Sequence, residues 1–287
     1  MSKLMFDLDL HLHSTASDGT LSPSELINKC AQNGLKVVAL TDHDTLNGIG
    51  EATKQAEVLG TIEVVPGIEV SCNWNGTEVH ILGLFTRADD ARLSEYCSRA
   101  RKNRLSRSKK IVERLQQIGI EIKFEKVTEL AGNAVIGRPH IAKALVDAGY
   151  VKYPKEAFDL YLGSSHSSYF PSSTISPIEA IDLLVESKAL PVLAHPMRSK
   201  VKSGRNPISN LSELISELKP RGLEGIEVYY GDYTDSQISR LSLIAKESDL
   251  IECGGSDFHN SGNPGEPQPG TVGPPMSTLS NLKNRLK

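Results

Sequence analysis

Short apolar runs alternate with helical patterns along most of this 287-residue chain, and this alternation restricts the possible fold more than any other feature. Strands that alternate with helices predict an α/β architecture with a largely parallel sheet. The expected strands are Met5–Leu10, Val37–Leu40, Glu63–Val65, Leu190–Leu193, Ile226–Tyr229 and Ile251–Cys253. One pair departs from this order, because Gly67–Asn73 and Glu78–Phe85 flank Asn75-Gly76, a strong hairpin signal.

The strand pattern stops in the middle of the chain. From residue 98 to about residue 170 the apolar side chains recur at helical spacing, as in Leu105, Val112 and Leu115. The α/β pattern resumes near Ser176-Pro177. We therefore expect a mostly helical insertion, or cap, over 98–170, between a first barrel part at 1–97 and a second at 171–287.

Composition excludes several classes of protein. The net charge is only −3, from 32 basic and 35 acidic residues, so any contact with nucleic acid must be local. The four cysteines lie far apart, which argues against a disulfide framework or a cysteine-type zinc site. No apolar run reaches the roughly 20 residues of a membrane span, and the first residues contain no secretory apolar segment. We expect a cytoplasmic protein without a membrane contact or an obligate protein partner.

Histidines and carboxylates gather at or just beyond the ends of the expected strands, where active-site loops converge in α/β sheets and barrels. His11 and His13 lie two residues apart, so in a strand both face the same side. Imidazole and carboxylate together suit zinc, manganese or iron. A single histidine is more often structural, but a set this large predicts two or three ions that share carboxylates. The nine candidates are His11, His13, Asp18, His43, Glu69, His80, His195, Asp257 and His259.

The motifs around these residues resemble the PHP (polymerase and histidinol phosphatase) family of metal-dependent phosphoesterases. They are His11-x-His13 with Ser17-Asp18-Gly19, Thr41-Asp42-His43-Asp44, Pro66-Gly67-Ile68-Glu69, Val79-His80-Ile81-Leu82-Gly83, Ala194-His195-Pro196 and Gly255-Ser256-Asp257-Phe258-His259. The resemblance runs from residue 7 to about residue 260, in the family's order of motifs. It implies a distorted seven-stranded α/β barrel of PHP type with a trinuclear metal site.

The resemblance also distributes the candidate ligands over three ions, with Glu69 as a bridge. The implied groups are His11, His13, Glu69 and Asp257; Asp18, His43 and His259; and Glu69, His80 and His195. Some relatives carry a histidine where Asp18 stands, and a carboxylate there favours manganese or iron over zinc. We expect up to three divalent transition-metal ions per chain, with manganese preferred and iron or zinc as alternatives.

Such a site predicts hydrolysis of phosphate esters. A hydroxide that bridges two cations can attack phosphorus at neutral pH, and the cations offset charge in the transition state. Asp257 would both bind metal and orient that hydroxide. Amide or lactone hydrolysis is possible on the same metals, but the resemblance and the nearby cationic residues favour phosphate. The predicted catalytic residues are Asp257, His195, Arg138 and His140.

Cationic side chains are the candidates for binding the substrate phosphate. In Gly137-Arg138-Pro139-His140, Arg138 can clamp a phosphate with two parallel hydrogen bonds, and His140 can bind it or protonate a leaving group. Arg198 and Arg104 are further candidates, and the row Arg101, Arg104 and Arg107 could guide a nucleic-acid backbone. The structural alternatives are that Arg138 binds a neighbouring carbonyl and that the basic run 99–110 is a solvated helix face.

The PHP-like motifs and the Gly-Arg-Pro-His insertion together resemble a nucleotide-acting subgroup. Its members remove the 3′-phosphate from nucleoside 3′,5′-bisphosphates and trim RNA or short oligonucleotides from the 5′ end. We therefore predict a hydrolase of phosphoric esters that acts on nucleotides or short oligonucleotides. Two alternatives stay open, a small-molecule phosphatase such as a histidinol phosphatase, and a non-catalytic module that binds metal or nucleic acid.

Overall fold

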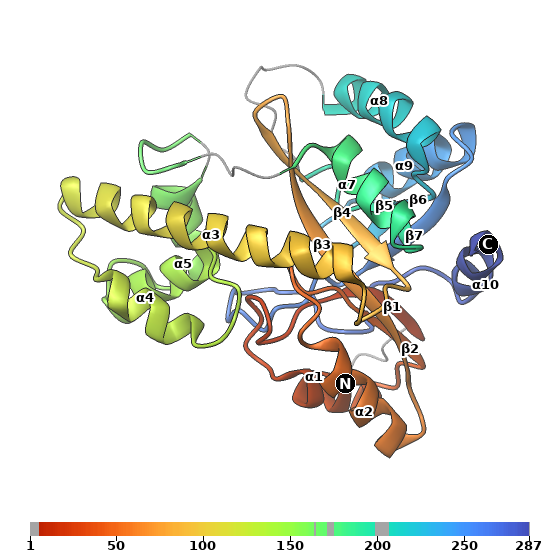
Figure 1. Cartoon of the computed structure of the whole chain (residues 1–287), viewed down its shortest axis with the longest axis horizontal. Helices are drawn as coiled ribbons and strands as arrows, with labels where there is room; N and C mark the ends of the chain where they lie inside the picture. Colours follow the sequence, from red (N-terminus) through yellow and green to blue (C-terminus); the bar gives the residue numbers. More distant parts are fainter. Residues whose placement is uncertain (1–5, 164, 171–174, 199–206, 287) are drawn as a thin grey trace.

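Seven strands form one sheet that curls into a nearly closed barrel (Figure 1). The computed structural model describes residues 6–163, 165–170, 175–198 and 207–286. The strands follow one another in chain order: β1 (Leu8–Leu12), β2 (Val37–Leu40), β3 (Glu63–Trp74), β4 (Thr77–Leu84), β5 (Leu190–Leu193), β6 (Gly225–Tyr230) and β7 (Ile251–Gly255). The two ends of the sheet meet where Leu12 pairs with Phe258 and the His13 amide donates to the Phe258 carbonyl at 3.0 Å.

The expected α/β barrel is confirmed, with differences at individual strands. β1 continues to Leu12, so His11 lies inside it, while the expected start at Met5 lies outside the described residues. The runs 63–65 and 67–73 form the single strand β3, although Pro66-Gly67 reads as a break. Pro66 pairs with Leu40 of β2, and a Cβ at Gly67 would lie 3.0 Å from the Leu40 carbonyl oxygen. The glycine therefore lets the two strands approach closely.

β4 runs antiparallel to both of its neighbours, whereas the other adjacent pairs are parallel. The hairpin turn between β3 and β4 has positive φ angles of 51° at Asn75 and 81° at Gly76, as a type I′ turn requires. Because β4 is reversed, its beginning lies at the edge where the parallel strands end. His80, near the start of β4, thereby reaches the same edge as residues that follow β1, β2, β5 and β7.

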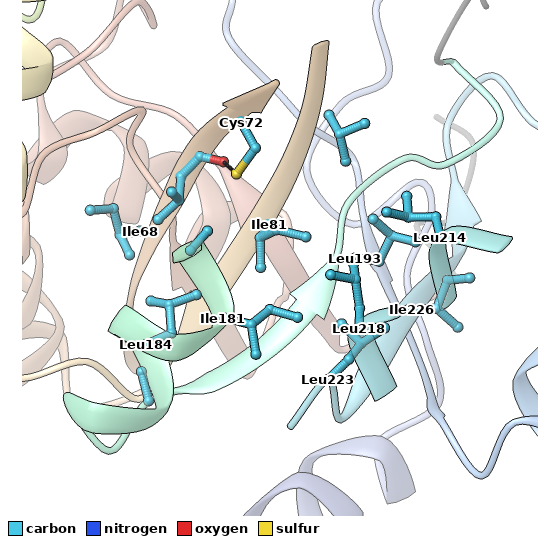
Figure 2. Close-up of a cluster of buried hydrophobic side chains, with 14 of the residues drawn as sticks. Ile68, Cys72, Ile81, Ile181, Leu184, Leu193, Leu214, Leu218, Leu223 and Ile226 are labelled. Atoms are coloured by element: carbon cyan, nitrogen blue, oxygen red, sulfur yellow. Dashed lines mark hydrogen bonds between the residues drawn. The ribbon is translucent and has the colours of Figure 1, made fainter. Parts of the chain in front are cut away.

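Helices cover the outside of the barrel. They are α1 (Pro23–Gln32), α2 (Ile49–Leu59), α7 (Pro177–Glu186), α8 (Pro207–Leu218), α9 (Asp235–Glu247) and α10 (Ser277–Arg285). Figure 2 shows Ile181 and Leu184 of α7 directed toward Ile68 of β3 and Ile81 of β4. A second cluster takes members from β1 to β5 and from β7, together with Leu279 and Leu282 of α10. Strands on opposite sides can share a cluster only through the middle, so this one fills the barrel.

The cap has a hydrophobic core of its own. It contains α4 (Phe124–Ala131), α5 (Arg138–Asp147), α6 (Pro154–Ala157) and a π-helical turn (Phe158–Leu162). Its buried residues run from Ile111 to Leu162, and none belongs to the barrel clusters. The long helix α3 (Ala91–Gln117) connects the two parts, because Leu93 and Tyr96 pack with the barrel while Val112 and Leu115 pack in the cap (Figure 1).

The expected boundary between residues 97 and 98 falls inside α3, and residue 171 lies outside the described residues. The division into 1–97, 98–170 and 171–287 therefore stays a prediction. Of the helices in the described part of the chain, none is long and apolar enough to cross a membrane.

The packing of α7 on the sheet gives a test of the fold. Leu184 is fully buried, and a Cβ on Gly83 would lie 2.3 Å from its Cδ2 atom. We expect Leu184→Ala to lower the free energy of unfolding by about 2–5 kcal/mol, because a cavity opens above β4. The control is Val185→Ala at the next position, where the side chain is 45% exposed. Urea denaturation would measure both, and equal shifts would contradict the packing described.

Candidate metal centre

The predicted ligands meet at the edge of the barrel where the parallel strands end. Three groups of side chains offer nitrogen or oxygen atoms within 4.8 Å of one another: His13, Asp18, His43 and His259; His11, His13, Glu69 and Asp257; and His43, Glu69 and His80. His195, the ninth candidate, places its Nε2 atom 3.2 Å from Nδ1 of His80. The grouping differs from the expected one in that His13 and His43 each belong to two groups.

Glu69 lies at the centre of this arrangement and is fully buried. Its two carboxylate oxygens approach five imidazoles. Oε1 lies 2.8 Å from Nδ1 of His80 and 2.9 Å from Nε2 of His195. Oε2 lies 3.0 Å from Nδ1 of His43, 3.2 Å from Nε2 of His13 and 3.4 Å from Nε2 of His11. One carboxylate therefore links residues from β1, β4 and the segments after β1, β2 and β5.

The position of Glu69 depends on the length of β3. β2 ends at Leu40, which pairs with Pro66, so β3 continues beyond the end of its neighbour. Glu69 then forms an isolated bridge with His43, and its amide donates to the Asp42 carbonyl at 3.2 Å. Most of the candidate ligands were expected at or just beyond strand ends, whereas Glu69 lies within β3 but level with the ends of the neighbouring strands.

Asp42 holds the loop that carries His13 and Asp18. Its carboxylate accepts hydrogen bonds from the Ser14 amide at 2.7 Å, the Ser14 hydroxyl at 2.6 Å and the Ser17 hydroxyl at 2.7 Å. The loop is also tight at Gly19, where a Cβ would lie 2.5 Å from the His13 carbonyl oxygen. Asp42 belongs to a quoted motif, but sequence reasoning assigned it no part in the site.

Glu227 on β6 was missed altogether. It is fully buried, accepts a hydrogen bond from the His195 amide at 2.7 Å and lies 2.9 Å from Nδ1 of His11. Because a carboxylate only accepts, Nδ1 of His11 carries the proton and Nε2 is left free on the side of Glu69 and Asp257. The signal that could have found Glu227 is a charged residue inside the apolar run Ile226–Tyr229.

The donor atoms have the spacing that a metal site needs, and two of them are buried without a hydrogen-bond partner. Two ligand atoms that are each about 2.1 Å from one ion lie roughly 3.0–3.4 Å apart. The Nε2 atoms of His11 and His13 are 3.1 Å apart. Nδ1 of His43 and Oε2 of Glu69 are buried without a hydrogen-bond partner. These residues therefore fit divalent cations held by nitrogen and oxygen.

The electrostatics of the cluster lead to the same conclusion. Burial by itself would raise the pKa values of Glu69, Asp18 and Asp257, but neighbouring imidazoles outweigh it and hold these pKa values well below their usual range. Burial opposes protonation of His13, yet hydrogen bonds to Asp257 and Glu69 raise its pKa to about 10. The carboxylates thus need positive charge nearby, which bound cations can supply in place of protons.

Two of the predicted basic residues on α3 face acceptors on the barrel. Nε of Arg104 donates to Oδ2 of Asp44 at 2.6 Å, and its NH2 group donates to the Ser71 hydroxyl at 2.7 Å. Asp44 directly follows His43, so Arg104 fastens α3 to the loop after β2. Arg107 lies 3.6 Å from Oε2 of Glu78, while Arg101 is exposed. The expected row of three arginines is therefore not one continuous surface.

Arg138 and His140 lie at the start of α5, close to β4. Arg138 donates to Oε2 of Glu78 at 2.8 Å, so its partner is a carboxylate rather than a carbonyl. Its guanidinium also lies over the rings of Phe158 at 5.6 Å and Tyr169 at 5.7 Å. Nδ1 of His140 accepts a hydrogen bond from the Gly137 amide at 3.1 Å. Its proton is then on Nε2, and burial lowers the pKa of this imidazole.

Arg198 lies at the rim of the cluster, with 53% of its side chain exposed. It donates to Oδ2 of Asp257 at 3.1 Å and to the Tyr230 hydroxyl at 2.6 Å. The Tyr230 hydroxyl in turn donates to Oδ2 of Asp257 at 2.7 Å. These two residues hold one oxygen of Asp257, while Oδ1 lies 3.1 Å from Nε2 of His13. Sequence reasoning missed Tyr230, which no motif marks.

Comparison with known proteins shows the family to which the chain belongs. The profile of the PHP domain matches residues 9–255. The chain belongs to the PHP domain family. The predicted family is thereby confirmed.

Two curated PHP relatives cover nearly the whole chain. A 5′-3′ exoribonuclease from Haemophilus influenzae is 35% identical over 251 residues, which are 88% of this chain and 89% of the relative. A 3′,5′-nucleoside bisphosphate phosphatase from Chromobacterium violaceum is 34% identical over 262 residues, 91% and 90% of the two chains. A structure described as an amidohydrolase from Chromobacterium violaceum, with bound sulfate and no metal, has a TM-score of 0.87. The two sequences are 31% identical, and the superposition covers 98% of this chain and 97% of the other chain.

The fit to metal predicts a gain in thermal stability on metal binding. Manganese at about 100 times its dissociation constant would stabilise the folded state by about 2.7 kcal/mol. For a chain of this size we expect Tm to rise by roughly 4–5 °C when manganese is added to chelator-treated protein. Glu69→Gln keeps the shape but removes the central charge, so its Tm should respond much less. A wild-type Tm that manganese leaves unchanged in differential scanning fluorimetry would contradict a metal site here.

Proposed function

We propose that this PHP-family chain is a metal-dependent phosphoesterase that hydrolyses phosphate esters of nucleotides. Its substrates are the 3′-phosphate of nucleoside 3′,5′-bisphosphates and the 5′ end of short RNA or oligonucleotides. The observation that carries the proposal is the convergence of nine metal-binding side chains beneath a rim that includes the half-exposed Arg198. The activities for which the two relatives are named support the choice of nucleotides.

The proposed cofactors are up to three divalent ions, manganese in preference to iron or zinc. The proposed ligands are His11, His13, Asp18, His43, Glu69, His80, His195, Asp257 and His259. Divalent ions bound there would activate water and offset negative charge on phosphate oxygens. The cytoplasmic location expected from the sequence stays a prediction.

Asp257 and His195 carry the proposed catalytic roles on the barrel side. Asp257 keeps its charge because nearby imidazoles hold its pKa well below the usual range, and Tyr230 with Arg198 fixes one of its oxygens. Burial lowers the pKa of His195, so its imidazole is neutral at pH 7 and Nε2 can act as a ligand beside Glu69. Both side chains are thus held in the form that the chemistry requires.

Cationic and donor groups around the rim would bind the substrate phosphate. Arg198 combines an exposed guanidinium with a contact to Asp257, so it can reach a phosphate next to the ligands. His140 is neutral with its proton on Nε2, which suits it to donate to a phosphate oxygen. Arg138 already shares Glu78 with Arg107, so a phosphate would have to compete with that carboxylate. Arg104 is more enclosed than Arg138 and Arg198, with 11% of its side chain exposed, and it acts through Asp44.

A substrate panel tests this function. We expect phosphate release from nucleoside 3′,5′-bisphosphates and mononucleotide release from 5′-phosphorylated oligoribonucleotides, with manganese more effective than zinc. Histidinol phosphate and an amide substrate are included in the panel, because a small-molecule phosphatase or an amidohydrolase would turn over those instead. Turnover of neither nucleotide substrate by the metal-loaded protein would overturn the proposal, and turnover of no substrate at all would favour a binding module.

Arg138 gives a sharper test of the phosphate contact. Loss of one charge-assisted hydrogen bond of about 2–3 kcal/mol corresponds to roughly 30- to 150-fold in kcat/KM. Arg138→Ala should lose most of that factor for a nucleoside bisphosphate, and Arg138→Lys should lose part of it because lysine keeps the charge without the planar fork. Metal content should stay unchanged in both, as in the exposed control Arg99→Ala. Wild-type kcat/KM in Arg138→Ala would leave Arg138 a structural role beside Glu78.

A further inference from the structure

A groove of about 500 Å³ lies on the cap, between the second half of α3 and the segment before residue 171. It is lined by Lys110, Glu113, Arg114, Gln117, Ser167 and Phe170. None of these residues contributes to the metal cluster, and the proposed phosphate contacts do not include them. The groove carries two cations and one carboxylate beside an aromatic ring, and its lining is otherwise polar.

A short series of contacts connects this groove to the metal cluster. Nε2 of His80 lies 3.5 Å from Oε1 of Glu78, and Oε2 of Glu78 lies 3.6 Å from NH2 of Arg107. Nε of Arg107 then donates to the carbonyl of Phe170 at 2.8 Å, and Phe170 lines the groove. Arg107 therefore contacts both Glu78, which lies beside the cluster, and Phe170, which lines the groove.

The spacing along α3 places its basic residues in line with that path. Arg107, Lys110 and Arg114 are three and four residues apart, so they share one face of the helix. At a rise of 1.5 Å per residue, Arg107 and Arg114 are about 10 Å apart along the axis. Lys110 and Arg114 are exposed, whereas Arg107 is partly buried against Glu78. A negatively charged chain leaving the cluster would thus meet two exposed cations in succession, of which Arg114 donates a hydrogen bond to Oε1 of Gln117 at 2.8 Å.

We propose that this groove binds the nucleotides on the 3′ side of the linkage that is cleaved when the substrate is an oligonucleotide. The inference rests on the proposed function and adds to it a second binding site. Phosphodiester groups would contact Lys110 and Arg114, and the half-buried ring of Phe170 offers a face on which a base can stack. Such contacts do not read sequence, so the site accepts any short single strand. An acidic protein segment would suit the same cations, but the link through Arg107 to the cluster favours substrate.

The test compares two substrates in one pair of variants. Lys110→Gln/Arg114→Gln removes both groove cations, and Lys102→Gln/Lys109→Gln removes two other exposed cations of α3 that do not line the groove. The substrates are a nucleoside 3′,5′-bisphosphate and a 5′-phosphorylated pentaribonucleotide. For the groove variant, the ratio of kcat/KM for the pentanucleotide to that for the bisphosphate should fall about three- to twentyfold, while the control variant keeps the wild-type ratio.

Direct binding separates the groove from the catalysis. With a fluorescent pentaribonucleotide and calcium in place of manganese, the slope of log Kd against log salt should decrease by about 1.4 in the groove variant, for two lost phosphate contacts. An unchanged ratio and an unchanged slope would overturn the groove while the bisphosphatase activity stands. If the wild-type protein turns over neither substrate, the proposed function fails, and the binding slope alone decides the groove.

Discussion

The carboxylate of Glu69 is the group on which the arrangement of this site depends. A buried carboxylate is costly unless it is paired and hydrogen-bonded, and here five imidazoles surround it. Those imidazoles come from widely separated parts of the chain, so the strands that carry them must hold one register. The reversed strand β4 is part of this constraint, because only its reversal brings His80 to the edge where the parallel strands end.

A second layer of carboxylates holds the ligands in place. Asp42 fixes the loop of His13, Glu227 fixes the proton on His11, and Asp44 receives Arg104 from the cap. The last contact matters for the whole molecule, since it joins α3 to the loop that carries His43. Asp44 also accepts a hydrogen bond from the Tyr96 hydroxyl, so two turns of α3 are tied to the metal centre. The cap is thus positioned by the same polar network as the ligands, although its hydrophobic core is separate.

The charges of the cap are arranged in two zones. Near the cluster, Glu78 already pairs with Arg138 and approaches Arg107. A phosphate bound there would replace Glu78 as the anionic partner of these arginines. Further along α3, Lys110 and Arg114 stand at an open groove. A small nucleotide can use only the first zone, whereas a longer strand can reach the second. This division offers a physical basis for one site that accepts both a bisphosphate and an oligonucleotide.

The resemblance of its motifs to the PHP family implied the barrel, and the sequence by itself determined the α/β alternation, the helical character of the middle segment and the nine candidate donor side chains. Those features leave local signals, namely alternation of strand and helix, spacing of two in His11 and His13, and short motifs around each ligand. The tertiary structure alone decided the partners of the donors and cations. Glu227 contacts His11, which is 216 residues away in the sequence. Arg104 faces Asp44 and Arg107 faces Glu78, rather than solvent. No periodicity encodes such contacts, because they arise only when closure of the barrel brings distant strands, loops and α3 together.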